Sequence, residues 1–205
     1  MPRLVTCEQT DGLAIIRLCD PDNGNVISEA LADQLCEVLE SLHASLPGAV
    51  LVASAGRVFC AGGNLRLFGG PHGQRRDRIE AIATRFHRAE QLLLELDCPL
   101  VVALQGAAAG AGMSLALTGD IIVASEDAVL VPAFSRLGLT ADGGSTWLLP
   151  RLLGMRRATE LLLTGRSLTA TEAAQLGLVS EVCPDRKSTR LNSSHIQKSR
   201  MPSSA

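Results

Sequence analysis

The sequence contains no tyrosine and few other aromatic residues, namely four Phe and Trp147 in a chain of 205 residues. With so few rings, the core has to be built mainly from Leu, Val, Ala and Ile. Hydrophobic residues still make up 46% of the chain and charged residues 20%, which is enough for one sizeable domain with its own core.

Other features are missing as well. No apolar run reaches the roughly 18 residues that a membrane span needs, and the opening MPRL does not resemble a signal peptide. The six cysteines include no Cys-x-x-Cys pair, which favours reduced thiols over disulfides or a zinc site. The net charge of −2 argues against a nucleic-acid partner. We therefore expect a cytoplasmic protein that binds no metal, membrane or nucleic acid.

Residues 185–205 differ from the rest of the chain because they are rich in Ser, Lys and Arg. A basic, disordered tail is the ordinary interpretation of such a composition. The peptide also resembles the conceptual translation of a sequencing-library adapter, and we favour that interpretation. We therefore expect residues 1–184 to be one domain that is incomplete at its C-terminus, followed by a non-native, disordered tail over 185–205.

Hydrophobic periodicity predicts alternating strands and helices, which is typical of an α/β domain with a mainly parallel sheet. An Asp11-Gly12 turn indicates a hairpin at the start, and Ser28 is a suitable N-cap for the first helix. Residues 67–78 are polar and predicted to be a mobile loop. The expected strands are 4–8, 13–18, 49–54, 99–104, 120–124 and 129–131, and the expected helices are 29–46, 79–96, 112–118, 144–153, 156–164 and 170–176.

The most informative segment is the glycine-rich stretch QGAAAGAGMS at residues 105–114, which follows an apolar strand. A turn of this kind, leading into a helix, leaves backbone N–H groups without partners and suits an anion. The anion is either a bound phosphate or an oxyanion that develops during a reaction. The glycine pattern is similar to the nucleotide loop of short-chain dehydrogenases, but those enzymes need a catalytic tyrosine that this chain lacks.

Three segments, at residues 57–65, 106–120 and 137–154, occur in the order and spacing of the crotonase (enoyl-CoA hydratase/isomerase) superfamily. Residues 163–166 and 173–179 match that superfamily as well, so the resemblance covers about residues 4–184. It implies a crotonase-type ββα spiral core over residues 1–184, truncated before the C-terminal helical region. It also implies an acyl-CoA substrate, no cofactor apart from the CoA of the substrate, and assembly into a homotrimer or hexamer.

The resemblance assigns the thioester oxygen to an oxyanion hole made by the amides of Gly63 and Ala111. Ala111 stands where many relatives have Gly, and its amide remains available if its φ is negative. Two such donors are worth about 3 kcal/mol each by analogy with other oxyanion holes. The residues that the resemblance places around the substrate or its CoA are Ala61, Gly62, Asn64, Leu65, Gly110, Phe134 and Leu139.

Hydratases of the superfamily use two glutamates, whose positions correspond here to Ser114 and Phe134 (Ala133 if the register slips by one). Neither side chain exchanges protons usefully near pH 7, which puts simple hydration in doubt. Asp142 instead falls where dienoyl-CoA isomerases and epoxyphenylacetyl-CoA isomerases carry an acid, and residues 134–154 look most like the latter group. One carboxylate suits a double-bond shift, because the same base can remove a proton and return it elsewhere.

We therefore predict an acyl-CoA isomerase of fatty acid or phenylacetate catabolism, with Asp142 as its catalytic residue. Four alternatives remain open. Asp142 is also a suitable cap for the following helix. The second alternative is a hydratase with an altered acid set. The third is an enzyme in which Asp142 attacks the substrate directly, as in the related dehalogenases. The fourth is a non-catalytic acyl-CoA-binding protein.

Overall fold

The structure, a computed structural model, describes residues 2–69 and 72–184. It begins with an antiparallel hairpin of β1 (Val5–Thr10) and β2 (Leu13–Leu18). The turn residues Asp11 and Gly12 both have positive φ, at 51° and 79°. Two consecutive positive φ values define a type I′ turn, which Asp-Gly favours and which matches the twist of the strands. The predicted hairpin is confirmed.

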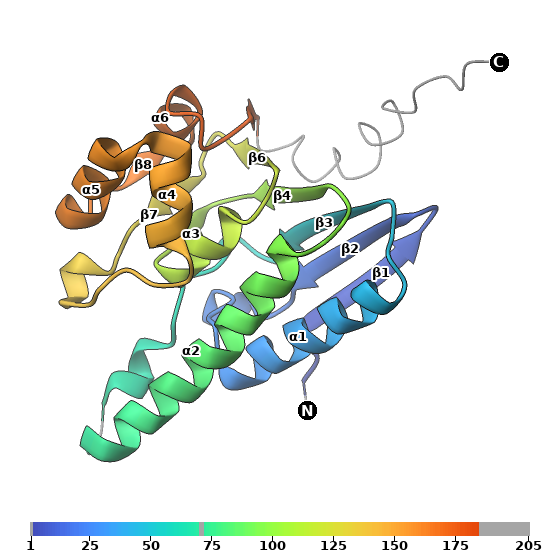
Figure 1. The fold of residues 1–205 in the computed structure, drawn as a ribbon, viewed down its shortest axis with the longest axis horizontal. Helices are drawn as coiled ribbons and strands as arrows, with labels where there is room; N and C mark the ends of the chain where they lie inside the picture. Colours follow the sequence, from blue (N-terminus) through green and yellow to red (C-terminus); the bar gives the residue numbers. More distant parts are fainter. Residues whose placement is uncertain (1, 70–71, 185–205) are drawn as a thin grey trace.

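A six-stranded sheet in the order β1-β2-β3-β4-β6-β9 forms the main layer (Figure 1). From β2 onward every neighbouring pair is parallel, as predicted for strand–helix alternation. The central strands are apolar on both faces, which is typical of a parallel sheet covered by other elements. The parallel strands after β2 are β3 (Ala49–Ser54), β4 (Leu100–Leu104), β6 (Ile121–Ser125) and β9 (Glu181–Cys183).

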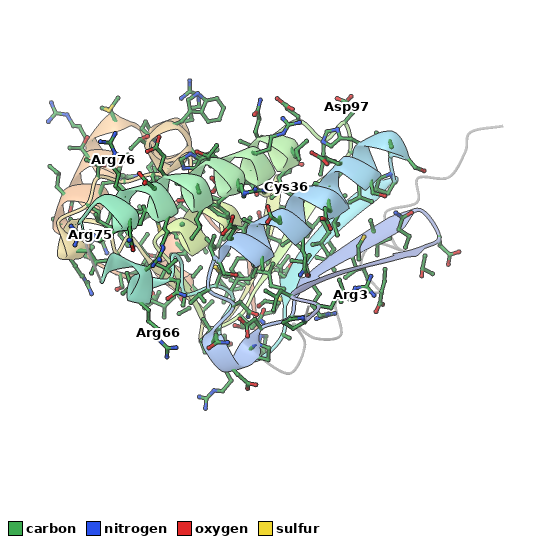
Figure 2. The ribbon with its side chains drawn as sticks, turned by 90° about the horizontal axis from the view of Figure 1, so that it is seen from below. Arg3, Cys36, Arg66, Arg75, Arg76 and Asp97 are labelled. Atoms are coloured by element: carbon green, nitrogen blue, oxygen red, sulfur yellow. The ribbon has the colours of Figure 1, made fainter. Side chains whose placement is uncertain are left out.

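Two helices, α1 (Glu29–Ala44) and α2 (His72–Leu94), lie side by side next to this sheet (Figures 1 and 2). The predicted cap of α1 is confirmed, because the Ser28 hydroxyl accepts a hydrogen bond from the amide of Leu31 at 3.2 Å. Leucines at three- and four-residue spacing make up the buried stripe of α1. Cys36, which Figure 2 labels on α1, donates from Sγ to the carbonyl oxygen of Arg85 on α2 at 3.4 Å.

The predicted mobile loop at residues 67–78 is wrong. A short 3₁₀ helix, η2 (Leu65–Phe68), is followed by α2, which begins at His72 rather than at residue 79. Residues 74–78 of α2 are polar and mostly exposed and show no apolar periodicity, and Arg76 pairs with Glu80 one turn later at 3.8 Å. This end of α2 extends away from the sheet in Figure 1, so it has no core face that a hydrophobic pattern could reveal.

A second, three-stranded sheet has the order β5-β7-β8 and contains two strands that the sequence did not indicate, β5 (Ala107–Ala109) and β8 (Leu168–Thr169). β8 has only two residues, and the three alanines of β5 lack the branched or aromatic side chains that favour a strand, while β9 in the main sheet was likewise not indicated. Thr169 also caps the last helix through a capping box with Glu172. The remaining elements are β7 (Val129–Val131), α3 (Ala111–Ala116), α4 (Ser145–Leu153), α5 (Met155–Thr164), α6 (Ala170–Gln175), η1 (Pro21–Asn23) and η3 (Ser135–Leu137).

No helix within residues 2–69 and 72–184 is long and apolar enough to cross a membrane. The predicted tail over residues 185–205 lies outside the described part of the chain, so the domain boundary at 184 stays a prediction.

Candidate active site

Two loops that follow neighbouring strands run beside each other at one edge of the main sheet. One leaves β3 and the other leaves β4, and because these strands are parallel both loops emerge at the same edge. A bridge joins Cys60 to Ala108: the amide of Cys60 donates to Ala107 O at 3.2 Å, and the amide of Ala109 donates to Cys60 O at 2.9 Å. These bonds fix the distance between the two loops.

Glycines allow this close approach. Gly62 has a φ of +85°, and a Cβ added there would lie 2.4 Å from the carbonyl oxygen of Ala109. A Cβ on Gly112 would lie 2.3 Å from the carbonyl oxygen of Cys60. Neither contact is possible for a real side chain, so the backbones meet here only because both positions lack one.

Gly63 and Ala111, one from each loop, line the same pocket, and their amides are the predicted oxyanion hole. Neither donates a hydrogen bond to another backbone group in the described part of the chain. Ala111 is the first residue of α3, whose N–H has no partner within the helix. The φ angle of Ala111 is not positive. Its amide therefore meets the condition given above for serving where many relatives have a glycine.

The pocket is mainly apolar and has a volume of about 90 Å³. One face of α2 forms much of its wall, because residues spaced three or four apart on a helix share a face. Asp142 and His87 are the ionisable side chains in this wall. The lining residues are Ile27, Gly63, Asn64, Leu67, Ile79, Ile82, Ala83, Phe86, His87, Ala111 and Asp142.

Asp142 lines the pocket and is not the N-cap of a helix. The N-cap of α4 is Gly144, and no side-chain hydrogen bond caps that helix. The capping interpretation of Asp142 is therefore wrong. Desolvation raises the pKa of the Asp142 carboxyl above its usual range, while the nearby His87 lowers that pKa. A raised pKa suits a group that must exchange protons near neutral pH.

The backbone of Asp142 is held from two sides. Its carbonyl oxygen accepts a hydrogen bond from the Ser145 hydroxyl at 2.7 Å and another from the Ser114 hydroxyl at 3.1 Å. Ser114 is fully buried on α3, one turn beyond Ala111. It therefore contacts the Asp142 backbone from the position where a hydratase is expected to carry an acid.

Two ionisable residues of α2 were missed by the sequence analysis. His87 Nε2 accepts a hydrogen bond from the amide of Gly143 at 3.3 Å. Glu90 is buried, and desolvation first and the charge of Asp142 second raise the pKa of its carboxyl to about 9. A signal was present, because Glu90 lies four residues after Phe86 and three before Leu93 and so occupies the apolar face of a predicted helix.

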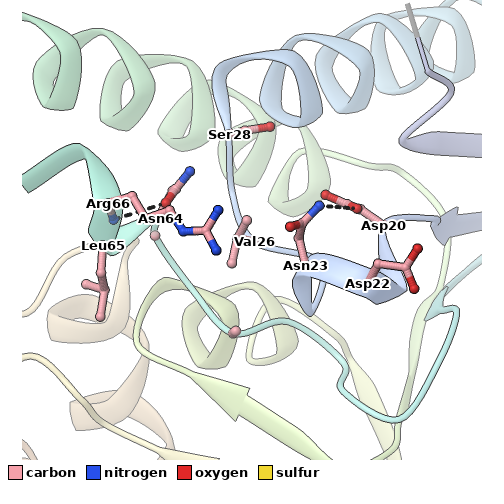
Figure 3. A pocket seen from close by; sticks show the side chains of 10 residues that line it. Asp20, Asp22, Asn23, Val26, Ser28, Asn64, Leu65 and Arg66 are labelled. Atoms are coloured by element: carbon pink, nitrogen blue, oxygen red, sulfur yellow. Dashed lines mark hydrogen bonds between the residues drawn. The ribbon is translucent and has the colours of Figure 1, made fainter.

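A second cavity, of about 540 Å³, adjoins the apolar pocket and shares Gly63 and Asn64 with it. Its lining is more polar (Figure 3). The Asn64 side chain accepts a hydrogen bond from the amide of Arg66 at 3.1 Å and thereby shapes this wall. The lining residues are Asp20, Asp22, Asn23, Val26, Ser28, Ala61, Gly63, Asn64, Leu65 and Arg66.

The predicted substrate-binding residues fall into three groups. Ala61, Asn64 and Leu65 line the larger cavity. Gly62 and Gly110 are buried in the loops behind the two amides, and the amide of Gly110 donates to Val131 O at 2.8 Å. The other two, Phe134 and Leu139, line neither cavity. The Phe134 ring is 7% exposed and lies 3.8 Å from the place of a Cβ on Gly110, whereas Leu139 is 38% exposed.

A sequence model of known families, described as Enoyl-CoA hydratase/isomerase, matches residues 8–201 of the chain. The chain belongs to the enoyl-CoA hydratase/isomerase family. The predicted membership of the crotonase superfamily is confirmed. The match continues past residue 184, where we expected the family's sequence to stop, and the nature of residues 185–205 therefore stays a prediction.

Individual members of the family differ in the reaction that their names state. The chain is 36% identical over 178 residues to a Rhodobacter capsulatus protein named "Probable enoyl-CoA hydratase", which covers 87% of this chain and 68% of the relative. It is 37% identical over 176 residues to the 1,2-epoxyphenylacetyl-CoA isomerase of Escherichia coli, covering 85% and 67%. It is also 34% identical over 180 residues to 4-chlorobenzoyl coenzyme A dehalogenase-2 of an Arthrobacter species, covering 87% and 65%. The chain thus spans about two thirds of the length of these relatives.

Solved structures of the family share the fold. The enoyl-CoA hydratase of Bacillus anthracis superposes with a TM-score of 0.85 at 29% identity, covering 92% of this chain and 73% of that one. The predicted crotonase-type α/β core is confirmed.

No group of three or more His, Cys, Asp or Glu side chains that could hold a metal occurs within the described residues.

Proposed function

We propose that this member of the enoyl-CoA hydratase/isomerase family is an acyl-CoA isomerase that shifts a double bond, or isomerises a ring epoxide, in a CoA thioester. The observation that carries the proposal is the shared pocket. Asp142 lines the same small apolar space as Gly63 and Ala111. In the proposed function these three residues supply a base and an oxyanion hole to one acyl group.

In the proposed reaction the thioester oxygen accepts hydrogen bonds from the amides of Gly63 and Ala111. Asp142 removes a proton from one carbon of the acyl group, and the negative charge collects on the thioester oxygen as an enolate. The same carboxyl then returns the proton to a different carbon, which leaves the double bond shifted and Asp142 ionised again. One carboxyl is sufficient for this sequence, because no water is added.

The residues at the two expected glutamate positions of a hydratase support an isomerase. Ser114 donates its proton to the carbonyl oxygens of Asp142 and Gly110, and Phe134 lies outside the pocket. Incubation with crotonyl-CoA and, separately, with a 3-enoyl-CoA tests this proposal. We expect conversion of the 3-enoyl-CoA and no addition of water to crotonyl-CoA. Hydration of crotonyl-CoA would favour the hydratase alternative, and binding of both without turnover would favour a non-catalytic acyl-CoA-binding protein.

The larger cavity is the proposed site of the CoA arm. It opens beside Gly63 and Asn64, where the thioester sulfur would leave the acyl pocket. Its polar lining suits the amide groups of the pantetheine arm. Asp20 and Asp22 carry negative charge that would repel the phosphates, and Arg66 is the cation in this lining. We therefore expect pantetheine, rather than the phosphates, to lie against Asp20 and Asp22.

Direct attack by Asp142 is a second candidate function, and the place of Asp142 in the wall of the apolar pocket favours it. In this reaction an Asp142 oxygen would bond to a substrate carbon as a halide leaves that carbon, and water would then cleave the resulting ester and restore the carboxylate. The 34% identity to the Arthrobacter dehalogenase is in keeping with this chemistry. Turnover in water labelled with heavy oxygen distinguishes the two functions, since only direct attack brings the label into the Asp142 carboxylate.

Assembly into a homotrimer or hexamer is also proposed for the whole protein. Apolar side chains on α4 and α5 are exposed, and Met155 and Leu163 reach exposed fractions of 69% and 73%. A cluster of this kind is typical of a surface that another subunit covers. Light scattering on the purified protein tests the proposal.

A further inference from the structure

Glu90 is a buried carboxyl group with an unpaired oxygen atom. Its exposed fraction is 4%, and its Oε1 atom has no hydrogen-bond partner among the residues that the structure describes. Neighbouring buried hydroxyls differ from it, because Ser114 and Ser145 both donate to the carbonyl oxygen of Asp142. Buried polar groups are almost always paired, so an unpaired carboxyl oxygen beside a reactive site requires an explanation.

Glu90 lies directly behind the turn at residues 142–143. A Cβ added to Gly143 would lie 3.0 Å from Glu90 Oε1, and the same point is 3.0 Å from Ser114 Oγ. Gly143 has a φ of +58° and is the residue after Asp142. The carboxyl of Glu90 and the hydroxyl that holds the Asp142 backbone therefore flank the same backbone position. His87, three residues earlier on α2, accepts a hydrogen bond from the Gly143 amide.

Charged and titratable groups near Glu90, on its helix and on the helix packed against it, come from several elements. The carboxylate of Asp142 raises the pKa of Glu90, and an ionised Glu90 would in turn raise the pKa of the Cys60 thiol. From α1, Asp33 and Glu29 pair with Arg85 at an exposed edge, and His43 bonds to the carbonyl oxygen of Leu92. Among the residues that the structure describes, none of these pairs includes Glu90. Its surroundings therefore favour the uncharged acid.

We propose that Glu90 is a positioning residue for Asp142, an uncharged acid packed behind the turn at residues 142–143 that keeps this part of the site to a single negative charge. The proposal rests on the proposed function, in which Asp142 is the base. Loss of the Glu90 proton would place a second carboxylate behind Asp142. The negative charge of Glu90 would raise the pKa of Asp142, so that Asp142 would hold a proton more tightly. The same charge would repel the negative charge of the enolate in the adjoining pocket and so destabilise it.

The test is a carbon-13 NMR titration of the Glu90 and Asp142 carboxyl groups combined with the pH dependence of isomerase turnover. We expect Glu90 to titrate near pH 9 in the native protein, and Asp142→Asn to lower that midpoint because the neighbouring charge is gone. Turnover of the native protein should fall above the same midpoint, by about tenfold one pH unit beyond it. Glu90→Gln should abolish this alkaline fall, because an amide carries no charge at any pH.

Glu80→Gln is the matched control, since Glu80 is an exposed glutamate on the same helix. It should change neither the Glu90 midpoint nor the alkaline fall. Titration of Glu90 in the ordinary carboxyl range, a midpoint that Asp142→Asn leaves unmoved, or an alkaline fall that persists in Glu90→Gln would each overturn the proposal. If Glu90→Gln does not fold, the NMR comparison of the native protein with Asp142→Asn still decides it.

The two proposals fail in different ways. Full turnover by Asp142→Asn would overturn the assignment of Asp142 as the base, even where the NMR midpoint of Glu90 has moved. An unmoved midpoint with lost turnover would leave Asp142 as the base and remove the role of Glu90.

Discussion

The amide of Gly143 donates a hydrogen bond to Nε2 of His87 at 3.3 Å and so ties the turn at residues 142–143 to helix α2. Ser114 holds the same turn from α3 through the carbonyl oxygen of Asp142. The candidate base is thus fixed through its backbone in the wall of the pocket. Groups held by the backbone in this way are suited to proton transfer at a defined position.

Replacing Asp142 by Asn should abolish isomerase turnover while leaving the fold intact. General acid–base catalysis contributes about 10²–10⁴-fold, and a loss of at least this size is expected in kcat. The side chain makes no capping bond, so unfolding by urea should be little changed. Calorimetric titration with a non-reacting acyl-CoA should show retained binding. Turnover at the native rate would contradict the assignment.

Adding a methyl group at Gly62 should separate the two loops and damage the oxyanion hole. The new Cβ would lie 2.4 Å from Ala109 O, and we expect Gly62→Ala to lose about 10²–10³-fold in kcat. Gly177→Ala is the control, because Gly177 has a similar φ of +79° and no atom near the place of its Cβ. The control should lose only about 1 kcal/mol of unfolding free energy and no activity. Equal activity losses in the two variants would show that the clash is not the cause.

Removing the Ser114 hydroxyl should loosen the turn that carries Asp142. Ser114→Ala loses the hydrogen bonds to the carbonyl oxygens of Asp142 and Gly110. We expect this loss to lower the free energy of unfolding by about 1 kcal/mol. We expect kcat to fall by about tenfold and the binding of acyl-CoA to change less. Thr118→Ala removes another buried hydroxyl of the same region, which bonds Leu115 O at 2.8 Å, and should lose stability without this fall in kcat.

Stability should decrease as the pH rises from about 4.5 to about 9, because Glu90 keeps its proton in the folded protein and releases it on unfolding. Within this window the unfolded chain binds fewer protons, so the folded state loses up to about 1.4 kcal/mol per pH unit. The raised pKa of Asp142 acts in the same direction. Urea unfolding at about pH 5 and about pH 8 should show a much smaller difference for Glu90→Gln than for the native protein. The same difference in both would argue against a protonated Glu90.

Cys60 should be unreactive although it lies next to Gly62 and Gly63. Burial raises the pKa of its thiol to about 12, and Sγ donates to the carbonyl oxygen of Asn25 at 3.1 Å. Iodoacetamide should leave Cys60 unmodified in the folded protein and modify it in urea, as read by mass spectrometry. The half-buried Cys7 and Cys98 provide the comparison within the same sample. Rapid modification of Cys60 in the folded protein would contradict the packing described here.

Much of the architecture could be predicted because its signals are local. The Asp11-Gly12 hairpin, the Ser28 cap and the apolar strands 49–54 and 129–131 each depend on residues adjacent in the chain. The polar start of α2 was missed for the opposite reason, since a helix that extends into solvent shows no apolar periodicity. The two-residue strand β8 leaves no sequence pattern at all.

Local patterns in the chain were enough to predict most of the strands and helices, the two glycine-rich loops and the candidate residue Asp142. Which of these segments come together depends on the tertiary structure. Residues 60–63, 108–112 and 142 are far apart in the chain, and parallel pairing of β3 with β4 places the first two segments side by side. Helix α2 then brings His87 and Glu90 against Asp142, a contact across about fifty residues that no local pattern encodes.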